Sequence, residues 1–176
     1  MPAQAHVTTG TDKVTVSVTK ALAAAGNYTA DDVMSESASA GTVWTFSAIV
    51  SGNGGSGTIV KAIALFETTA LTPGLTLFLF SATPTAALND NVANTAVLHA
   101  DEANFVGRIT FPAMADLGTG DSEAIVTPSL ATGNVPLAFN CAPGDSALYG
   151  IVVTRDGITG EAAGDDLIIK LLIERD

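Results

Sequence analysis

The sequence holds 176 residues, of which 47% are hydrophobic and 14% are charged. This length and composition predict a single globular domain and exclude an intrinsically disordered chain. Acidic residues outnumber basic residues by 18 to 7, which gives a formal net charge of −11 at pH 7. Nucleic-acid backbones and anionic membrane surfaces both repel such a chain, so we expect no nucleic acid and no membrane among its partners.

Residues 1–11 are polar and have no hydrophobic periodicity, which predicts a flexible N-terminal arm. They also lack the apolar segment of a secretory signal, and no apolar run in the chain approaches the ~20 residues of a membrane span. We therefore expect a soluble protein made in the cytoplasm. Residues 12–176 are expected to form one β-sandwich domain, beginning with a half-buried strand at Lys13–Thr19, in which valine alternates with polar residues.

The most apolar part of the chain, Ser56–Pro84, predicts a central hairpin. Its second strand, Leu75–Phe80, is apolar on both alternating faces, which is typical of a strand covered on both sides. Its first strand, Thr58–Phe66, is expected to place Ile59, Ile63 and Leu65 on one face and Val60, Ala62, Ala64 and Phe66 on the other. Pro73-Gly74 is predicted to form the turn between them, with a positive φ at the glycine.

Alternating or short apolar runs predict further strands at Val43–Val50, Val106–Phe111, Ala124–Thr127, Pro136–Asn140, Ala147–Arg155 and Leu167–Glu174. Thr83–Ala103 is the longest irregular stretch and is expected to be functional or to lie at a contact. Within it, Asp101 is predicted to cap a single helical turn. About eight to ten strands without a sustained helix predict an all-β, antiparallel β-sandwich that is jelly-roll-like.

No motif in the sequence points to an enzyme. Gly52–Gly57 matches the dinucleotide fingerprint by its letters, but strand-forming residues follow where that motif needs a helix. His6 lies in the predicted arm, which leaves His99, with Asp101, as the available pair for nucleophilic catalysis, and we expect a solvated histidine instead. Cys141, the single cysteine, is expected to be a small buried apolar residue.

Binding chemistry is also sparse. Asp31-Asp32, Asp90 and Asp165-Asp166 offer oxygen ligands for Ca²⁺, but none has the spacing of a calcium loop, and a structural calcium stays open. Trp44 shares a strand face with Phe46, which favours a place in the core over a sugar-stacking platform. We therefore expect no catalytic, cofactor-binding or metal-ligating residues.

Five segments, in this order and spacing, carry a resemblance to a known family: Tyr28–Val33, Gly54–Val60, Leu77–Pro84, Gly107–Pro112 and Leu148–Ile151. From about Asn27 to Ile173 the chain resembles the capsid decoration, or cement, proteins of tailed bacteriophages. The resemblance implies a non-enzymatic virion structural protein with a β-sandwich domain. It further implies binding to the major capsid protein, a homotrimer at the three-fold positions, and a location on the capsid surface.

Two other functions fit the same sequence. One is another virion part, such as a tail component or the base of a head fibre. The other is a carbohydrate-binding or adhesion module, for which an exposed Trp44 would be the simplest structural sign.

Overall fold

The computed structural model describes residues 12–23, 26–67, 71–118, 120–129, 134–160 and 164–176. The predicted arm, residues 1–11, lies outside the described residues. The described chain forms ten strands and one short 3-10 helix: β1 (Asp12–Ala21), β2 (Trp44–Phe46), β3 (Ser56–Phe66), β4 (Leu75–Phe80), η1 (His99–Asn104), β5 (Phe105–Phe111), β6 (Ala115–Asp116), β7 (Ser122–Val126), β8 (Leu137–Asn140), β9 (Leu148–Thr154) and β10 (Asp166–Arg175).

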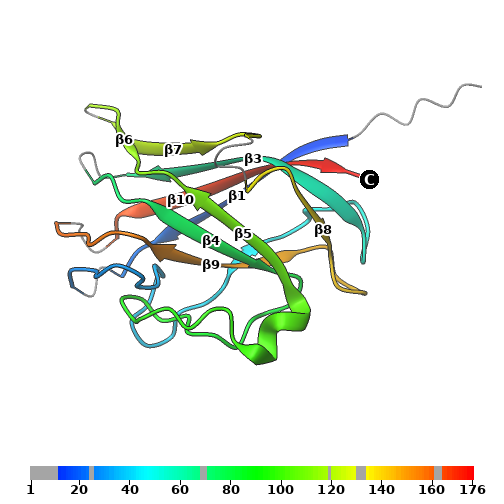
Figure 1. Cartoon of the computed structure of the whole chain (residues 1–176), viewed down its shortest axis with the longest axis horizontal. Coiled ribbons are helices and arrows are strands. Elements are labelled where there is room, and N and C mark those ends of the chain that lie inside the picture. The colour runs from blue at the N-terminus through cyan, green and yellow to red at the C-terminus, as the bar shows by residue number, and fades with distance from the viewer. Residues whose placement is uncertain (1–11, 24–25, 68–70, 119, 130–133, 161–163) are drawn as a thin grey trace, which may run out of the picture.

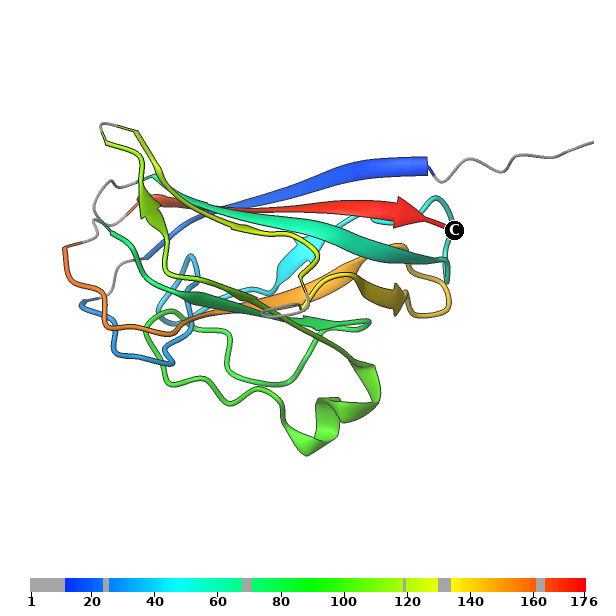
Figure 2. The ribbon, with the colours of Figure 1, turned by 45° about the horizontal axis from the view of Figure 1, so that its top comes forward.

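The strands form two antiparallel sheets that face each other (Figures 1 and 2). The larger sheet has the order β1-β10-β3-β7-β6, with β8 also paired to β3, and the smaller sheet has the order β2-β9-β4-β5. The main apolar core lies between them. The predicted all-β sandwich is therefore confirmed.

Strand β4 lies inside the smaller sheet, between β9 and β5, and all six of its residues are buried. Leu75, Leu77 and Leu79 face the main core. Phe78 and Phe80 face the opposite way, into a second apolar cluster. The prediction of a central strand covered on both sides is confirmed.

The predicted hairpin between β3 and β4 is wrong. These strands belong to different sheets: β3 pairs with β10, β7 and β8, whereas β4 pairs with β9 and β5. Gly74 does not adopt a positive φ. Instead, its N–H donates to Asp156 Oδ2 over 2.7 Å, and its carbonyl accepts from the backbone N–H of Arg155. These hydrogen bonds hold Gly74 against the segment that follows β9. The two strands instead lie in facing sheets, and their inner apolar residues meet in the main core.

The faces predicted for β3 are confirmed from Ala62 to Phe66 but are wrong for Ile59 and Val60, because the register of β10 against β3 shifts at Val60. Lys61 pairs with Leu172 and Ile59 with Ile173, which leaves Val60 as an extra residue. A bulge of this kind moves the residues before it to the other face of the strand. Four fully buried side chains consequently share the inner face: Ile59, Ala62, Ala64 and Phe66.

The strand predicted at Val43–Val50 is shorter than expected, because only Trp44–Phe46 pairs with β9. Ala48 has a φ of 52°, and this left-handed residue turns the chain out of the strand. The Arg175 side chain then donates to the carbonyls of Ala48 and Ile49. Trp44 is only 1% exposed, which confirms its predicted place in the core.

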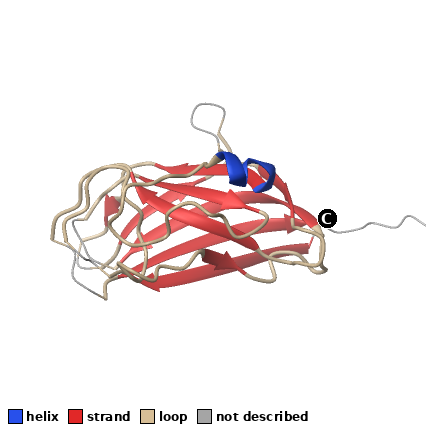
Figure 3. Ribbon diagram, turned by 90° about the horizontal axis from the view of Figure 1, so that it is seen from below, coloured by secondary structure: helices blue, strands red, loops and turns tan. Residues whose placement is uncertain are grey.

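The long segment between β4 and β5 forms a third layer over the outer face of the smaller sheet (Figures 2 and 3). Apolar residues of this segment pack on the Phe78 and Phe80 cluster: Ala86, Leu88, Val92, Ala96 and Val97. Two buried carboxylates hold it in place. Asp90 accepts hydrogen bonds from the Tyr28 hydroxyl, over 2.7 Å, and from the Ser35 N–H, over 2.8 Å.

Asp101 is the second of these carboxylates, and it does not cap a helix as predicted. It lies inside η1, which begins after Leu98 and has no side-chain cap. Asp101 is 3% exposed and accepts hydrogen bonds from the backbone N–H groups of Thr85 and Ala86 and from the Thr85 hydroxyl. Burying a carboxylate without hydrogen-bond donors costs more free energy than leaving a short helix uncapped. Tertiary contacts, rather than the helix, therefore determine where the Asp101 side chain lies.

Truncation of a β4 core residue should measure how far the fold depends on this strand. Leu79 is fully buried, so Leu79→Ala should lower the free energy of unfolding by roughly 2–5 kcal/mol in urea denaturation. Leu98→Ala is the matched control, because Leu98 is 37% exposed and its truncation should change stability by less than about 0.5 kcal/mol. An unchanged unfolding midpoint for Leu79→Ala would contradict the central position of β4.

Candidate functional site

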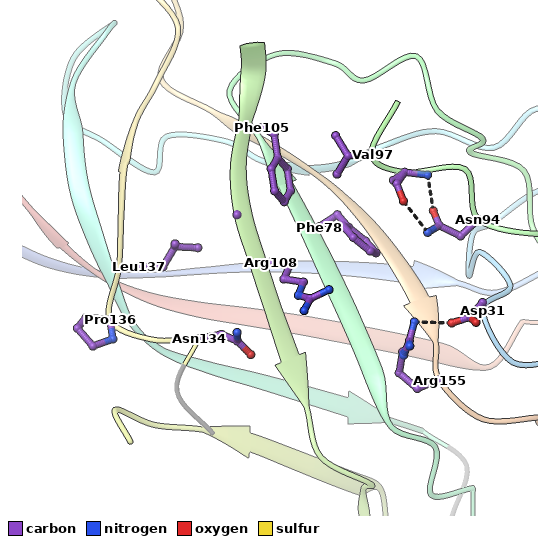
Figure 4. A pocket seen from close by; sticks show the side chains of 12 residues that line it. Asp31, Phe78, Asn94, Val97, Phe105, Arg108, Asn134, Pro136, Leu137 and Arg155 are labelled. Atoms are coloured by element: carbon purple, nitrogen blue, oxygen red, sulfur yellow. Dashed lines mark hydrogen bonds and ion pairs between the residues drawn. The ribbon is translucent and has the colours of Figure 1, made fainter. Parts of the chain in front are cut away.

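A groove of about 830 Å³ lies on the outer face of the smaller sheet (Figure 4). It lies beside the third layer, where that layer stops covering the strands. Its lining comes from six parts of the chain: Asp31, Phe78 on β4, Asn94, Ala96 and Val97 in the third layer, Phe105, Gly107 and Arg108 on β5, Asn134, Pro136 and Leu137 at the start of β8, and Arg155 after β9.

The sheet register places the floor of the groove. Phe78 pairs with Arg108 across β4 and β5, and Phe80 pairs with Phe105, so these four side chains share the outer face. Residues directly opposite each other in an antiparallel pair point to the same side of the sheet. Phe105 is 37% exposed, and its ring lies 5.5 Å from that of Phe80, measured between centroids. The floor is thus aromatic, with a guanidinium group at its edge.

One wall of the groove depends on a glycine. Gly107 has a φ of +153°, and a Cβ atom at this position would lie 2.9 Å from Leu137 Cδ1. The missing side chain lets Leu137 approach the backbone of β5 closely. Asn134, which lies before Leu137 in the chain, accepts a hydrogen bond from the Thr110 N–H over 3.0 Å. This wall is therefore fixed to β5 rather than free to move away from it.

The two arginines of the groove differ in their pairing. Arg155 Nη1 forms an ion pair with the carboxylate of Asp31. Arg108 is exposed and makes no hydrogen bond or ion pair with any residue that the structure describes. The Asn94 side chain accepts a hydrogen bond from the Ala96 N–H and donates one to the Ala96 carbonyl. The groove thus carries a positive charge without a local counter-charge, on a protein whose formal charge is −11.

A second charged cluster lies on the inner side of β1. Lys20 is 8% exposed, and its Nζ donates to Glu36 Oε2 over 2.5 Å, to the carbonyl of Thr42 and to the Thr42 hydroxyl. The same Nζ lies 5.5 Å from the centroid of the Trp44 ring, a distance suited to a cation–π contact. Every donor of the ammonium group is satisfied within the protein, which indicates a structural role for this cluster.

The pKa values of the pair follow from this arrangement. Burial lowers the pKa of Lys20, and the hydrogen bond and charge of Glu36 oppose that effect. Burial alone would raise the pKa of Glu36, but hydrogen bonds from Lys20, Thr42 and Ser35 outweigh it and lower the pKa to about 2. Glu36 therefore stays ionised well below the pH at which an ordinary glutamate takes up a proton.

A third cluster surrounds the cysteine. Cys141 is 5% exposed, as predicted for a small apolar residue, and its burial, with the nearby charge of Asp145, raises the pKa of its thiol. The Tyr149 hydroxyl donates to Asp145 Oδ2 over 2.6 Å, which raises the pKa of Tyr149 and lowers that of Asp145. A thiol with a raised pKa is a poor nucleophile, so this cluster does not favour cysteine chemistry.

The structure does not bring the candidate catalytic residues together. The His99 ring contacts Glu102, with 3.1 Å between Nδ1 and Oε2, and its side chain is 96% exposed. The carboxylate of Asp101 is instead occupied by Thr85 and Ala86. The glycine-rich segment at 52–57 runs into strand β3, where the dinucleotide motif would need the start of a helix.

The acidic pairs also remain apart. Asp31 pairs with Arg155, Asp32 accepts from the N–H and the hydroxyl of Thr29, and Asp90, within the third layer, accepts from the Tyr28 hydroxyl and the Ser35 N–H. In the part of the chain that the structure describes, no group of three His, Cys, Asp or Glu residues could hold a metal ion.

Sequence reasoning missed the groove itself. Arg108 and Arg155 lie 47 positions apart in the sequence, and only the pairing of β5 and β9 with β4 brings them to one face. The one available signal was an arginine within an apolar strand, at Gly107-Arg108-Ile109, since charged residues seldom lie in such runs without a function or a partner.

No protein-family model matches the sequence, and no curated protein matches it significantly. Among the described residues, no helix is long and apolar enough to cross a membrane.

The Glu36 cluster predicts a specific loss of stability in acid. The unfolded chain protonates Glu36 near its ordinary pKa of about 4.3, whereas the folded protein does so only near 2. The contribution of Glu36 is therefore complete above pH ~4.5 and is lost as the pH falls toward 2. Glu36→Gln should lower the free energy of unfolding by about 1–2 kcal/mol at pH 7, and the difference from wild type should shrink over this window.

Urea denaturation at pH 7, 4.5, 3.5 and 2.5 measures this difference. Glu102→Gln removes the same charge from an exposed side chain and should show no comparable pH-dependent difference from wild type. A constant difference between wild type and Glu36→Gln from pH 7 to 2.5 would contradict the assigned pKa.

Proposed function

We propose that this chain is a non-enzymatic structural protein of a bacteriophage virion that binds the capsid surface and stabilises the shell. It would be made in the host cytoplasm and would bind the major capsid protein. The resemblance of five ordered segments to capsid decoration proteins supports the proposal. The architecture supports it as well, because a sandwich with a third layer is a rigid body suited to repeated placement on a symmetric surface.

The observation that carries the proposal is the anchored end of β1. This strand is at the edge of the larger sheet and pairs with β10 from Asp12–Arg175 to Ala21–Asp166. Lys13 and Glu174 form an ion pair of 2.7 Å near its first residue. Residues 1–11 thus continue from a fixed point, and 11 extended residues span at most about 40 Å. That reach suits contact with a neighbouring subunit or with the capsid floor.

The hairpin of β6 and β7 supports self-association, for which we propose a homotrimer. Leu117 and Ile125 on this hairpin are 51% and 41% exposed. Strand β6 pairs only with Ser122 and Glu123, which leaves the outer edge of β7 unpaired beyond them in the described structure. Open strand edges and exposed apolar residues are both common at contacts between protein chains.

The alternatives draw on other features. A tail or head-fibre component would use the same rigid domain and is separated from a decoration protein only by its position in the virion. A carbohydrate-binding module would need an exposed aromatic platform. Trp44 is buried and cannot supply one, whereas Phe105 in the groove is 37% exposed, so the structure argues against sugar stacking at Trp44 only.

Deletion of residues 1–11 should separate folding from capsid binding. The deleted form should keep the unfolding midpoint of the domain, because after Met1 the deleted residues include only one sizeable aliphatic side chain, Val7. It should nevertheless bind undecorated capsids less than the full-length protein does and raise their melting temperature less. A decoration protein stabilises the shell by mass action, and an arm on each of many copies adds to that effect.

Capsid occupancy after sedimentation and capsid melting by calorimetry are the two measurements. As a composition control, a form whose first 11 residues are replaced by a Gly/Ser segment of equal length should behave like the deletion. Equal occupancy and melting for all three forms would remove the arm from the mechanism. If full-length protein does not bind capsids at all, the decoration role is wrong.

A further inference from the structure

We infer that the groove over Phe78 and Phe105 is a docking site for an extended acidic peptide segment of a partner protein, whose carboxylate binds Arg108. The inference goes beyond the virion role, because any protein that exposes such a segment could fill the site. It depends on the charge, the length and the lining of the groove.

Charge decides which group binds. The groove contains Arg108 and Arg155 against a single carboxylate, Asp31, which is already paired with Arg155. Arg108 has no hydrogen bond or ion pair with the described residues. A guanidinium group above an aromatic floor can form two parallel hydrogen bonds with a carboxylate, and such charge-assisted bonds are stronger than neutral ones.

Length favours a peptide over a compact ligand. The groove crosses from Leu137, beyond the edge of β5, over β5 and β4 to Arg155 after β9. Neighbouring strands lie about 4.8 Å apart, so this path is roughly 15 Å long. An extended peptide rises about 3.3 Å per residue, so four to five residues span it. Figure 4 shows the lining side chains spread along this path rather than gathered around one point.

The lining away from Arg108 suits apolar side chains. Val97 on the third layer and Leu137 and Pro136 at the start of β8 stand on opposite sides of the floor, as Figure 4 shows. A segment with one carboxylate and an apolar residue near it would therefore meet complementary groups along its length. Burial of an apolar side chain here adds affinity in proportion to the area that it covers.

The N-terminal arm of a second copy does not fit this description. Residues 1–11 contain no aspartate or glutamate, so an arm in this groove would leave Arg108 without a counter-charge. The occupant that the chemistry identifies is a separate acidic segment, and the arm requires a different contact.

Two matched peptide pools test the inference on the full-length, isotope-labelled protein. Each pool holds capped pentapeptides with Leu, Val, Thr or Ser at four positions, and the central residue is Asp in one pool and Asn in the other. The acidic pool should shift the amide resonances of Gly107, Arg108 and Val97 with at least about tenfold higher affinity than the neutral pool. Arg108→Gln should abolish this preference.

Lys170→Gln is the matched control, since Lys170 carries the same charge on β10 of the other sheet and its loss should leave the preference unchanged. Val97→Ser should weaken binding of the acidic pool, while thermal melting verifies that each variant is folded. The inference would be overturned if both pools bound equally, or if the shifted amide resonances belonged to residues outside the groove. Equal effects of Arg108→Gln and Lys170→Gln on the preference would also overturn it. N-acetyl-aspartate methylamide is a single capped aspartate without neighbouring residues. If it binds as tightly as the acidic pool, the groove recognises only a carboxylate, and the inference of an extended peptide is overturned.

Discussion

The two-sided burial of β4 is the constraint on which the rest of the structure depends. Leu77 and Leu79 need an apolar cover on one face, and Phe78 and Phe80 need another on the opposite face. The larger sheet supplies the first cover. Since the protein has no third sheet in its described residues, the irregular segment between β4 and β5 supplies the second. The long connection between β4 and β5 is thus also part of the core.

This solution also creates the groove. The third layer is held by hydrogen bonds to Asp90 and Asp101, and its apolar residues cover β4 and β9 only in part. Where the cover ends, an aromatic floor and Arg108 face solvent. The feature that stabilises the fold and the feature that can bind a partner are therefore two parts of one sheet face, and both depend on how the third layer is anchored.

Local periodicity predicted strands and burial well, because side-chain alternation reports which face of a strand is covered. The strands at β1, β5, β9 and β10 lie close to their predicted positions, and Leu79 and Trp44 are buried as expected. Strand partners could not be predicted, since alternation does not say whether β4 pairs with β3 or packs against it. The bulge at Val60 and the position of Arg108 beside Phe78 likewise depend on register, which long-range pairing sets.

We propose that the chain lies on the outer surface of a capsid. A cryo-EM reconstruction of the virion encoded by the same genome tests this proposal most directly. The account predicts density for the two-sheet domain on the outside of the shell, in three copies around the three-fold positions, with additional density leading from the first residue of β1 to a neighbour. Density for the domain at the tail or at a fibre base, or virions that lack the protein altogether, would contradict the account.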